Sequence, residues 1–164
     1  MKTLYILRHA KSSWKDDSLQ DFDRPLNGRG RKAGELIGTL MRQKKLIPDL
    51  LLSSPAVRAR ETIEIVMKTA RLLAELRYDQ RIYEAGPLRL LEVISQIEED
   101  KRSVLLVGHN PGLGELLQLL TGRVEHLATG TLVKIDLSTT KWSEALEGKG
   151  SLDWLVKAKE LDQS

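Results

Sequence analysis

The sequence predicts an α/β protein, a three-layer α/β/α sandwich with a mostly parallel central sheet. Short, β-rich apolar runs alternate along the chain with segments whose apolar residues recur at helical spacing. Turn formers or the start of a helical pattern follow the runs, as expected where crossover helices connect parallel strands. With 164 residues, 41% of them hydrophobic, the chain is expected to form one domain spanning residues 1–164.

The first strand is expected at residues 2–8, a short apolar run that ends at a charged pair, Arg8 and His9. The polar stretch 11–30 contains turn formers and a proline, and it predicts an ordered loop. Apolar residues then recur at helical spacing, which predicts a helix over about 28–45.

A second buried strand is expected at residues 49–53. Ser54 and Pro55 follow it and predict the N-cap and first position of a helix that runs to about residue 72. The polar residues 77–87 are expected to be a connection.

A third helix is expected to open at Pro87, and residues 103–107 give the strongest strand signal in the chain. A fourth helix follows over about 112–121. Segments 130–138 and 151–157 are expected to be late strands, antiparallel at an edge of the sheet.

Basic side chains follow the ends of the predicted strands. Arg8 and His9 end the first, Arg58 comes soon after the second, and His109 follows a later one. Functional groups of open α/β sheets gather beyond the carboxyl ends of the strands, so these four are expected in one crevice. Phosphate fits such a pocket, because an arginine fork matches two phosphoryl oxygens. Backbone N–H groups near Ser54 and Pro111 are expected to add donors.

Each of these residues also has a purely structural interpretation. His109 alone fits a packing residue, Arg8 a strand-end ion pair, and Arg58 and Arg60 a solvated helix face beside two glutamates. The functional interpretation is favoured because His or Arg follows three separate strand ends at once or within one helical turn.

Three motifs resemble those of the histidine phosphatase superfamily, the RHG-type, phosphoglycerate-mutase-like proteins. They are LRHAK at 7–11, SSPAVRARET at 53–62 and VGHNPG at 107–112. Chain length, the residues after the first motif and the D-x-x-R-P-L segment at 21–26 are nearest to the short SixA-type phosphohistidine phosphatases.

The resemblance implies catalytic roles for five residues. His9 is the expected nucleophile, with Arg8, Arg58 and His109 as phosphate ligands, and Glu84 is the candidate general acid. It also puts Lys11 and Ser12 among the expected substrate-binding residues. No metal ion or cofactor is expected.

The predicted reaction is hydrolysis of a phosphohistidine through a covalent phosphohistidine intermediate on His9. The partner is then a phosphorylated protein. A small-molecule phosphomonoesterase of the same superfamily and a phosphate-binding module without turnover are the alternatives. Ala10 and Lys11 depart from the commonest motif, in which a glycine and, in the mutases, an acidic residue stand there.

Composition argues against other classes. The formal charge of +3 comes from 26 basic and 23 acidic residues, and aromatic residues make up 4% of the chain, so nucleic acid is not an expected partner. There are no cysteines. No apolar run approaches the ~20 residues of a membrane span, and a soluble cytoplasmic protein is expected. The sequence assigns no oligomeric state.

Three further groups carry expectations. Asp21, Asp23 and Arg24 are expected to tie down the first loop by hydrogen bonds rather than to act in catalysis. Trp14 either offers a recognition surface to a partner or covers the core. His126 is expected to be structural or exposed.

Overall fold

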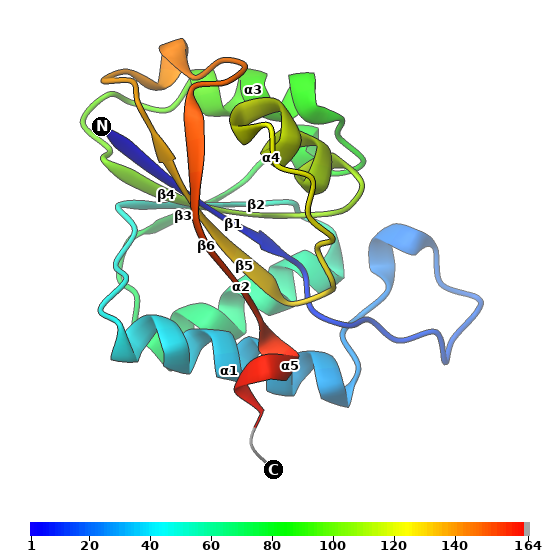
Figure 1. Cartoon of the computed structure of the whole chain (residues 1–164). Coiled ribbons are helices and arrows are strands. Elements are labelled where there is room, and N and C mark those ends of the chain that lie inside the picture. Colours follow the sequence, from blue (N-terminus) through cyan, green and yellow to red (C-terminus); the bar gives the residue numbers. More distant parts are fainter. Residues whose placement is uncertain (163–164) are drawn as a thin grey trace.

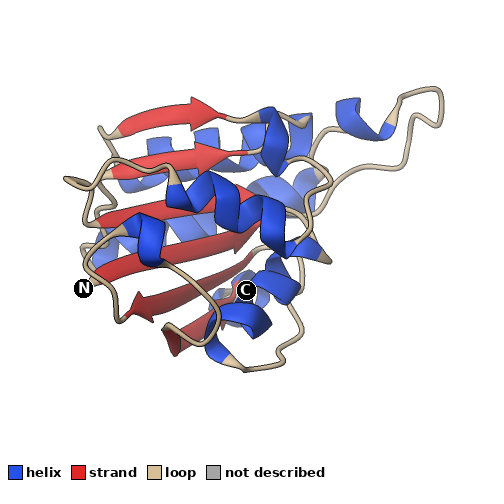
Figure 2. Cartoon of the chain, turned by 90° about the horizontal axis from the view of Figure 1, so that it is seen from above, coloured by secondary structure: helices blue, strands red, loops and turns tan. Residues whose placement is uncertain are grey.

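The computed structural model describes residues 1–162, and its centre is one six-stranded sheet of order β3-β2-β4-β1-β5-β6. The strands are β1 (Lys2–Arg8), β2 (Leu50–Ser53), β3 (Glu75–Tyr78), β4 (Ser103–Gly108), β5 (Thr131–Leu137) and β6 (Gly150–Lys157). Strands β1 to β4 are parallel, and their arrows in Figure 2 point toward the segment that projects from the molecule. Strand β5 runs antiparallel to β1, and β6 lies antiparallel to β5 at the edge, which confirms the expectation for both late strands.

Helices cover both faces of the sheet, as Figure 1 shows. One face carries α1 (Gly28–Gln43), α2 (Val57–Ala70) and the short α5 (Ala158–Leu161). The other carries α3 (Pro87–Ser95) and α4 (Gly112–Thr121). The predicted three-layer α/β/α sandwich is therefore confirmed. No helix among residues 1–162 combines the length and the apolar character needed to cross a bilayer.

The alternation of side chains along β1 explains why there are two cores. Leu4 and Ile6 belong to the cluster on the α3 and α4 side, while Tyr5 and Leu7 belong to the cluster on the α1 and α2 side. Successive side chains of a strand point to opposite faces, so a strand with consecutive apolar residues must be covered on both faces. The central strands are thereby held rigidly, and their carboxyl ends are fixed in space.

The start of α1 lies directly against the segment that follows β1. Asn27 is the N-cap, and its side-chain oxygen accepts a 2.8 Å hydrogen bond from the Gly30 N–H. A Cβ added at Gly30 would lie 2.1 Å from the carbonyl oxygen of Lys11, which no side chain tolerates. Glycine at this position therefore lets the helix pack on the backbone beside His9.

Some local predictions differ from the structure. Strand β3 was not predicted, because its four residues are half-buried or exposed and give no apolar run. The second helix begins at Val57 with Ala56 as N-cap rather than at Ser54 and Pro55, and it ends at Ala70 rather than near residue 72. The four-residue α5 was also missed, because it is too short to show a period.

Candidate active site

His9 lies immediately after β1 and is almost fully buried, with 6% of its surface exposed. Its Nδ1 lies 2.7 Å from the carbonyl oxygen of Ala10. A carbonyl oxygen only accepts hydrogen bonds, so Nδ1 carries the proton and donates it. The lone pair of the ring is then on Nε2, where the Nε–H of Arg58 approaches to 3.3 Å. The backbone thus selects the tautomer that leaves Nε2 unprotonated.

His109 follows β4 and faces His9, with 5.1 Å between the two ring centroids. Its Nε2 lies 2.7 Å from the hydroxyl oxygen of Ser54, which already accepts a hydrogen bond from the Ala56 N–H. In the tautomer in which the Ser54 hydroxyl donates to Nε2, the ring proton lies on Nδ1. That Nδ1 is buried and has no hydrogen-bond partner among the described residues, so in this tautomer it is a donor for a ligand.

Arg8 ends β1 and has a second donor without a partner. Its Nη1 donates to the carbonyl oxygen of Leu127 at 2.9 Å, and the same oxygen accepts a 2.9 Å hydrogen bond from the Asn110 side chain. The buried Nε of Arg8 has no partner within residues 1–162. Burial and the neighbouring Arg58 guanidinium lower the pKa of Arg8 from its ordinary value, so an anion is the group that would stabilise it.

Arg58 comes from the first turn of α2 and is fixed by Asp21 in the first loop. Its Nη1 donates to the Asp21 carbonyl oxygen at 2.7 Å, and its Nη2 donates to the Asp21 carboxylate at 3.0 Å. The Tyr83 hydroxyl donates to the same carboxylate oxygen at 2.7 Å, and Arg24 donates to the other oxygen at 3.0 Å. Asp21 therefore joins the first loop to the guanidinium nearest His9.

Burial keeps both imidazoles neutral at physiological pH. Burial lowers the pKa of His9 to about 3. The hydrogen bond to the Ala10 carbonyl opposes this shift, and His109, Arg58 and Arg8 reinforce it. Burial and then Arg58 lower the pKa of His109 to about 4, against an opposing contribution from Asp21. Two uncharged rings beside two guanidiniums can bind an anion and attack it without first losing a proton.

The pKa of Asp21 falls to about 2, although its partial burial works in the opposite direction. Hydrogen bonds from Tyr83, Arg58 and Arg24, together with the charge of Arg58, outweigh that burial. The carboxyl group is thus ionised at neutral pH and cannot donate a proton to a leaving group.

Two adjoining cavities open onto these residues. A cavity of about 360 Å³ is lined by Arg8, His9, Lys11, Ser12 and Trp14 among others. A second, of about 570 Å³, is lined on one side by Asp21, Tyr83, Glu84, Pro111 and Glu115. Arg58, His109 and Asn110 line both.

The structure thus brings Arg8, His9, Arg58 and His109 together at the carboxyl end of the sheet. Lys11 is exposed, and the buried Ser12 hydroxyl accepts a hydrogen bond from Arg24. Glu84 is exposed, with a left-handed backbone (φ 56°), and lies on the cavity that Arg58 and His109 share.

The remaining predicted groups divide into two kinds. Asp21 and Arg24 do tie the first loop, but Asp21 also holds Arg58, which was not foreseen; the Asp23 side chain has no hydrogen bond among the described residues. Trp14 is 76% exposed at the cavity rim, with the Arg24 guanidinium 3.2 Å from its ring centroid, so it does not cover the core. His126 is exposed.

Sequence reasoning missed the roles of two residues. Ser54 was interpreted as a helix cap, although its place directly after β2 already put it at the functional end of the sheet. Tyr83 bonds to Asp21 and meets His109 edge-on at 5.5 Å between ring centroids, and no sequence spacing indicated it. Within residues 1–162, no three His, Asp or Glu side chains are grouped as metal ligands.

A doubly covered, mostly parallel sheet that gathers two neutral imidazoles and two guanidiniums at its carboxyl end defines an α/β protein with a basic site suited to a phosphoryl group. The particular family follows from comparison with known proteins. The chain belongs to the histidine phosphatase superfamily (branch 1), which matches residues 4–126.

The similar proteins include solved structures and curated relatives. The protein assigned as the phosphohistidine phosphatase SixA of Agrobacterium tumefaciens has a TM-score of 0.82 and 28% identity, covering 94% of this chain and 97% of that one. The corresponding protein of Nakamurella multipartitia has a TM-score of 0.84 at 23% identity, over 94% and 95%. An uncharacterized protein of Mycobacterium tuberculosis is 35% identical over 114 residues, covering 70% of this chain and 69% of its own length. Phosphoglycerate mutase 1 of Saccharomyces cerevisiae is 32% identical over 43% of this chain and 29% of its own length.

Proposed function

We propose that the chain is a phosphohistidine phosphatase, which removes a phosphoryl group from a protein through a covalent intermediate on His9. The observation that carries the proposal is the hydrogen bond from His9 Nδ1 to the Ala10 carbonyl. It leaves an unprotonated nucleophile at Nε2, beside the guanidinium of Arg58. The similarity to the SixA protein of Agrobacterium tumefaciens supports the choice of substrate class.

In the first step the Nε2 lone pair of His9 attacks phosphorus. A nitrogen–phosphorus bond forms while the bond to the leaving atom breaks, and that electron pair leaves with the departing group. Charge spreads over the three equatorial oxygens of the phosphoryl group. Arg8 Nε and His109 Nδ1 are buried and have no partner among residues 1–162. With its proton on Nδ1, His109 is suited to stabilise that charge together with Arg8 and Arg58.

In the second step water attacks the phosphorylated His9, inorganic phosphate leaves, and the ring recovers its Nε2 lone pair. The Ala10 carbonyl holds the Nδ1 proton throughout and stabilises the cationic ring of the intermediate. We assign protonation of poor leaving groups to Glu84, which lines the same cavity as Arg58 and His109. Lys11 and Ser12 are assigned to substrate binding at the cavity rim.

Trp14 supports a protein substrate over a small one. Trp14 is 76% exposed at the mouth of a polar cavity, where its amphipathic ring can pack against the surface of a protein substrate. Arg24 stacks on one face of its ring and fixes the orientation. The proposal includes a cytoplasmic location, catalysis without a metal ion or cofactor, and one catalytic domain over residues 1–164.

The test uses a protein that carries phosphohistidine and a panel of phosphomonoesters. We expect kcat/KM to be at least about tenfold higher for the phosphohistidine protein. His9→Ala should abolish turnover, and labelled wild-type enzyme quenched in base should retain phosphate in an acid-labile linkage. His126→Ala, an exposed histidine away from the cavities, is the matched control.

Two outcomes would contradict the proposal. Turnover by the His9→Ala variant would remove the nucleophile. A preference for sugar phosphates would instead assign the chain to small-molecule phosphomonoesterases with the same chemistry.

A further inference from the structure

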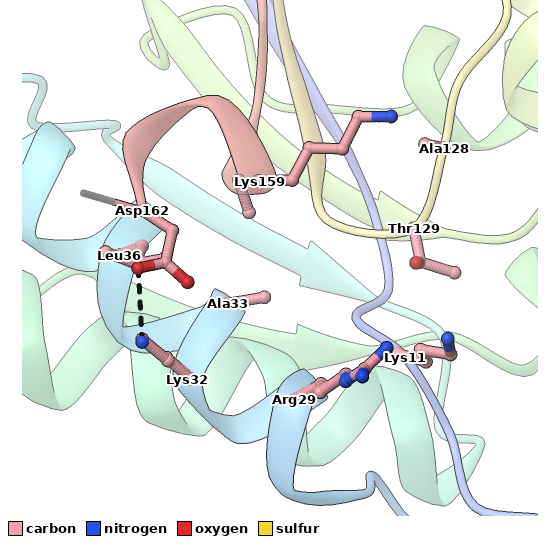
Figure 3. Close-up of a pocket in the computed structure, with 10 residues that line it drawn as sticks. Lys11, Arg29, Lys32, Ala33, Leu36, Ala128, Thr129, Lys159 and Asp162 are labelled. Carbon is pink, nitrogen blue, oxygen red and sulfur yellow. Dashed lines mark ion pairs between the residues drawn. The ribbon is translucent and has the colours of Figure 1, made fainter. Parts of the chain in front are cut away.

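A third cavity, of about 580 Å³, lies beside the catalytic one, and we call it the basic groove. It lies between the start of α1, the short α5 and the segment 127–130. Figure 3 shows the side chains of Lys11, Arg29 and Lys159 around the same opening, each from a different segment of the chain. The mechanism proposed above uses neither Arg29 nor Lys159.

The basic groove adjoins the catalytic cavity. Lys11 and Thr129 line both spaces, so a polypeptide bound in the groove lies next to the catalytic cavity. The segment that carries Thr129 is fixed to the catalytic residues, because the Gly130 N–H donates to the carbonyl oxygens of Arg8 and His9 at 3.1 Å. The Ala158 N–H in turn donates to the Gly130 carbonyl at 3.0 Å, which joins α5 to the same segment. The groove therefore has a fixed position relative to the nucleophile.

The charge of the groove is poorly compensated. Lys11, Arg29 and Lys159 are exposed, and none of them has an ion pair or a side-chain hydrogen bond among residues 1–162. The fourth cation, Lys32, differs because it pairs with Asp162 at 3.1 Å, as drawn in Figure 3. Three like charges around one opening repel one another, and carboxylates placed between them would relieve that repulsion.

The floor of the groove indicates what kind of anion fits. Ala33, Leu36, Ala128 and Ala158 line it, and a free phosphate or a sugar phosphate would gain nothing from such an apolar surface. A polypeptide that carries both acidic and apolar side chains satisfies the cations and covers the floor at once.

We propose that the basic groove binds an acidic segment next to the phosphorylated residue of a protein substrate. The proposal rests on the function proposed above and names a feature of its substrate. Carboxylates meet Lys11, Arg29 and Lys159, an apolar side chain lies on the alanines and Leu36, and the phosphoryl group reaches His9 through the space beside Thr129.

The test measures binding of two peptides that carry a non-hydrolysable phosphonate analogue of phosphohistidine. One has a Glu-Leu-Glu flank and the other a Gln-Leu-Gln flank, tried on either side of the analogue. We expect the acidic peptide to bind wild-type protein about tenfold more tightly at low salt, as a few exposed ion pairs would give, and less so at high salt. In an R29E/K159E double variant the acidic peptide should lose that advantage.

A matched control carries the same change in net charge outside the groove. Arg89 and Arg102 are exposed and line none of the three cavities, so R89E/R102E should keep the preference. Equal affinity of the two peptides for wild-type protein would overturn the proposal that the groove binds an acidic segment. Loss of the preference in both double variants would overturn it as well. Hydrolysis of a phosphohistidine protein with either flank tests the proposed function separately, since it requires only His9 and its neighbours.

Discussion

Acidification should destabilise the fold through the imidazoles of His9 and His109. His9 and His109 have pKa values lowered to about 3 and about 4, whereas a histidine in the unfolded chain has its ordinary value of 6.5. Both rings are neutral in the folded state, so below the unfolded pKa the unfolded chain binds protons that the folded chain does not. The contribution of the two neutral rings to the free energy of unfolding is complete above pH 6.5. It is lost as the pH falls from 6.5 toward the pKa values that the rings have in the folded state.

The size of the effect follows from those shifts. At about pH 5 the unfolded rings are nearly all protonated, and the difference of about 1.5 units from 6.5 corresponds to about 2 kcal/mol for each ring. The two rings together should lower the free energy of unfolding by about 4 kcal/mol relative to neutral pH. That is a large part of the stability of an ordinary domain.

Urea unfolding at neutral pH and at about pH 5 measures the effect, in buffers without phosphate because a bound anion would itself stabilise the fold. A His9→Gln/His109→Gln variant is the comparison, and it should lose much less stability over the same interval. If wild type and variant lose the same free energy, the rings titrate normally in the folded state. Their burial would then not keep them neutral.

Three further predictions concern the site and its surroundings. Asp21→Asn should lower kcat/KM for a phosphomonoester by about tenfold to a hundredfold, because Arg58 loses a charged hydrogen-bond partner. Asp17→Asn, a change at an exposed residue, should leave kcat/KM unchanged. Equal rates for both variants would contradict a positioning role of Asp21. Gly30→Ala should cost about 1–3 kcal/mol in urea unfolding, because its Cβ would meet the Lys11 carbonyl, whereas Gly28→Ala has open space and should change stability by less than about 1 kcal/mol. Chelation with EDTA followed by dialysis should leave phosphomonoesterase activity unchanged, and activity restored only by a divalent metal would refute metal independence.

The layers of the fold were predictable because the central strands and helices carry strong local patterns. β1 and β4 carry apolar runs at residues 4–7 and 104–107, and α3 opens at a proline that cannot continue a preceding element. Strand β3 was not predictable from the sequence. It is a short edge strand with charged, partly exposed residues, and its pairing with β2 is what defines it. The sequence pattern therefore identifies strands and helices whose own side chains are buried. It misses a strand that is defined by its pairing with a neighbouring strand.

The site divides in the same way. Arg8, His9, Arg58 and His109 were found because each follows a strand end, where chain position alone fixes the location in a parallel sheet. The hydrogen bonds from Arg58 and Tyr83 to Asp21 were not predicted, because these three residues come from segments far apart in the sequence. Ser54 shows an intermediate case, since its position was predictable and its hydrogen bond to His109 was not.

The carbonyl oxygen of Leu127, which accepts hydrogen bonds from both Arg8 and Asn110, makes a main-chain atom the anchor of a proposed phosphate ligand. Every amino acid supplies that oxygen, so substitutions at 127 that preserve packing leave the anchor in place. Inserting or deleting a residue between Leu127 and Gly130 would instead move the oxygen relative to β1. The constraint on this segment is therefore on its length, and related chains should vary there in side-chain identity sooner than in residue number.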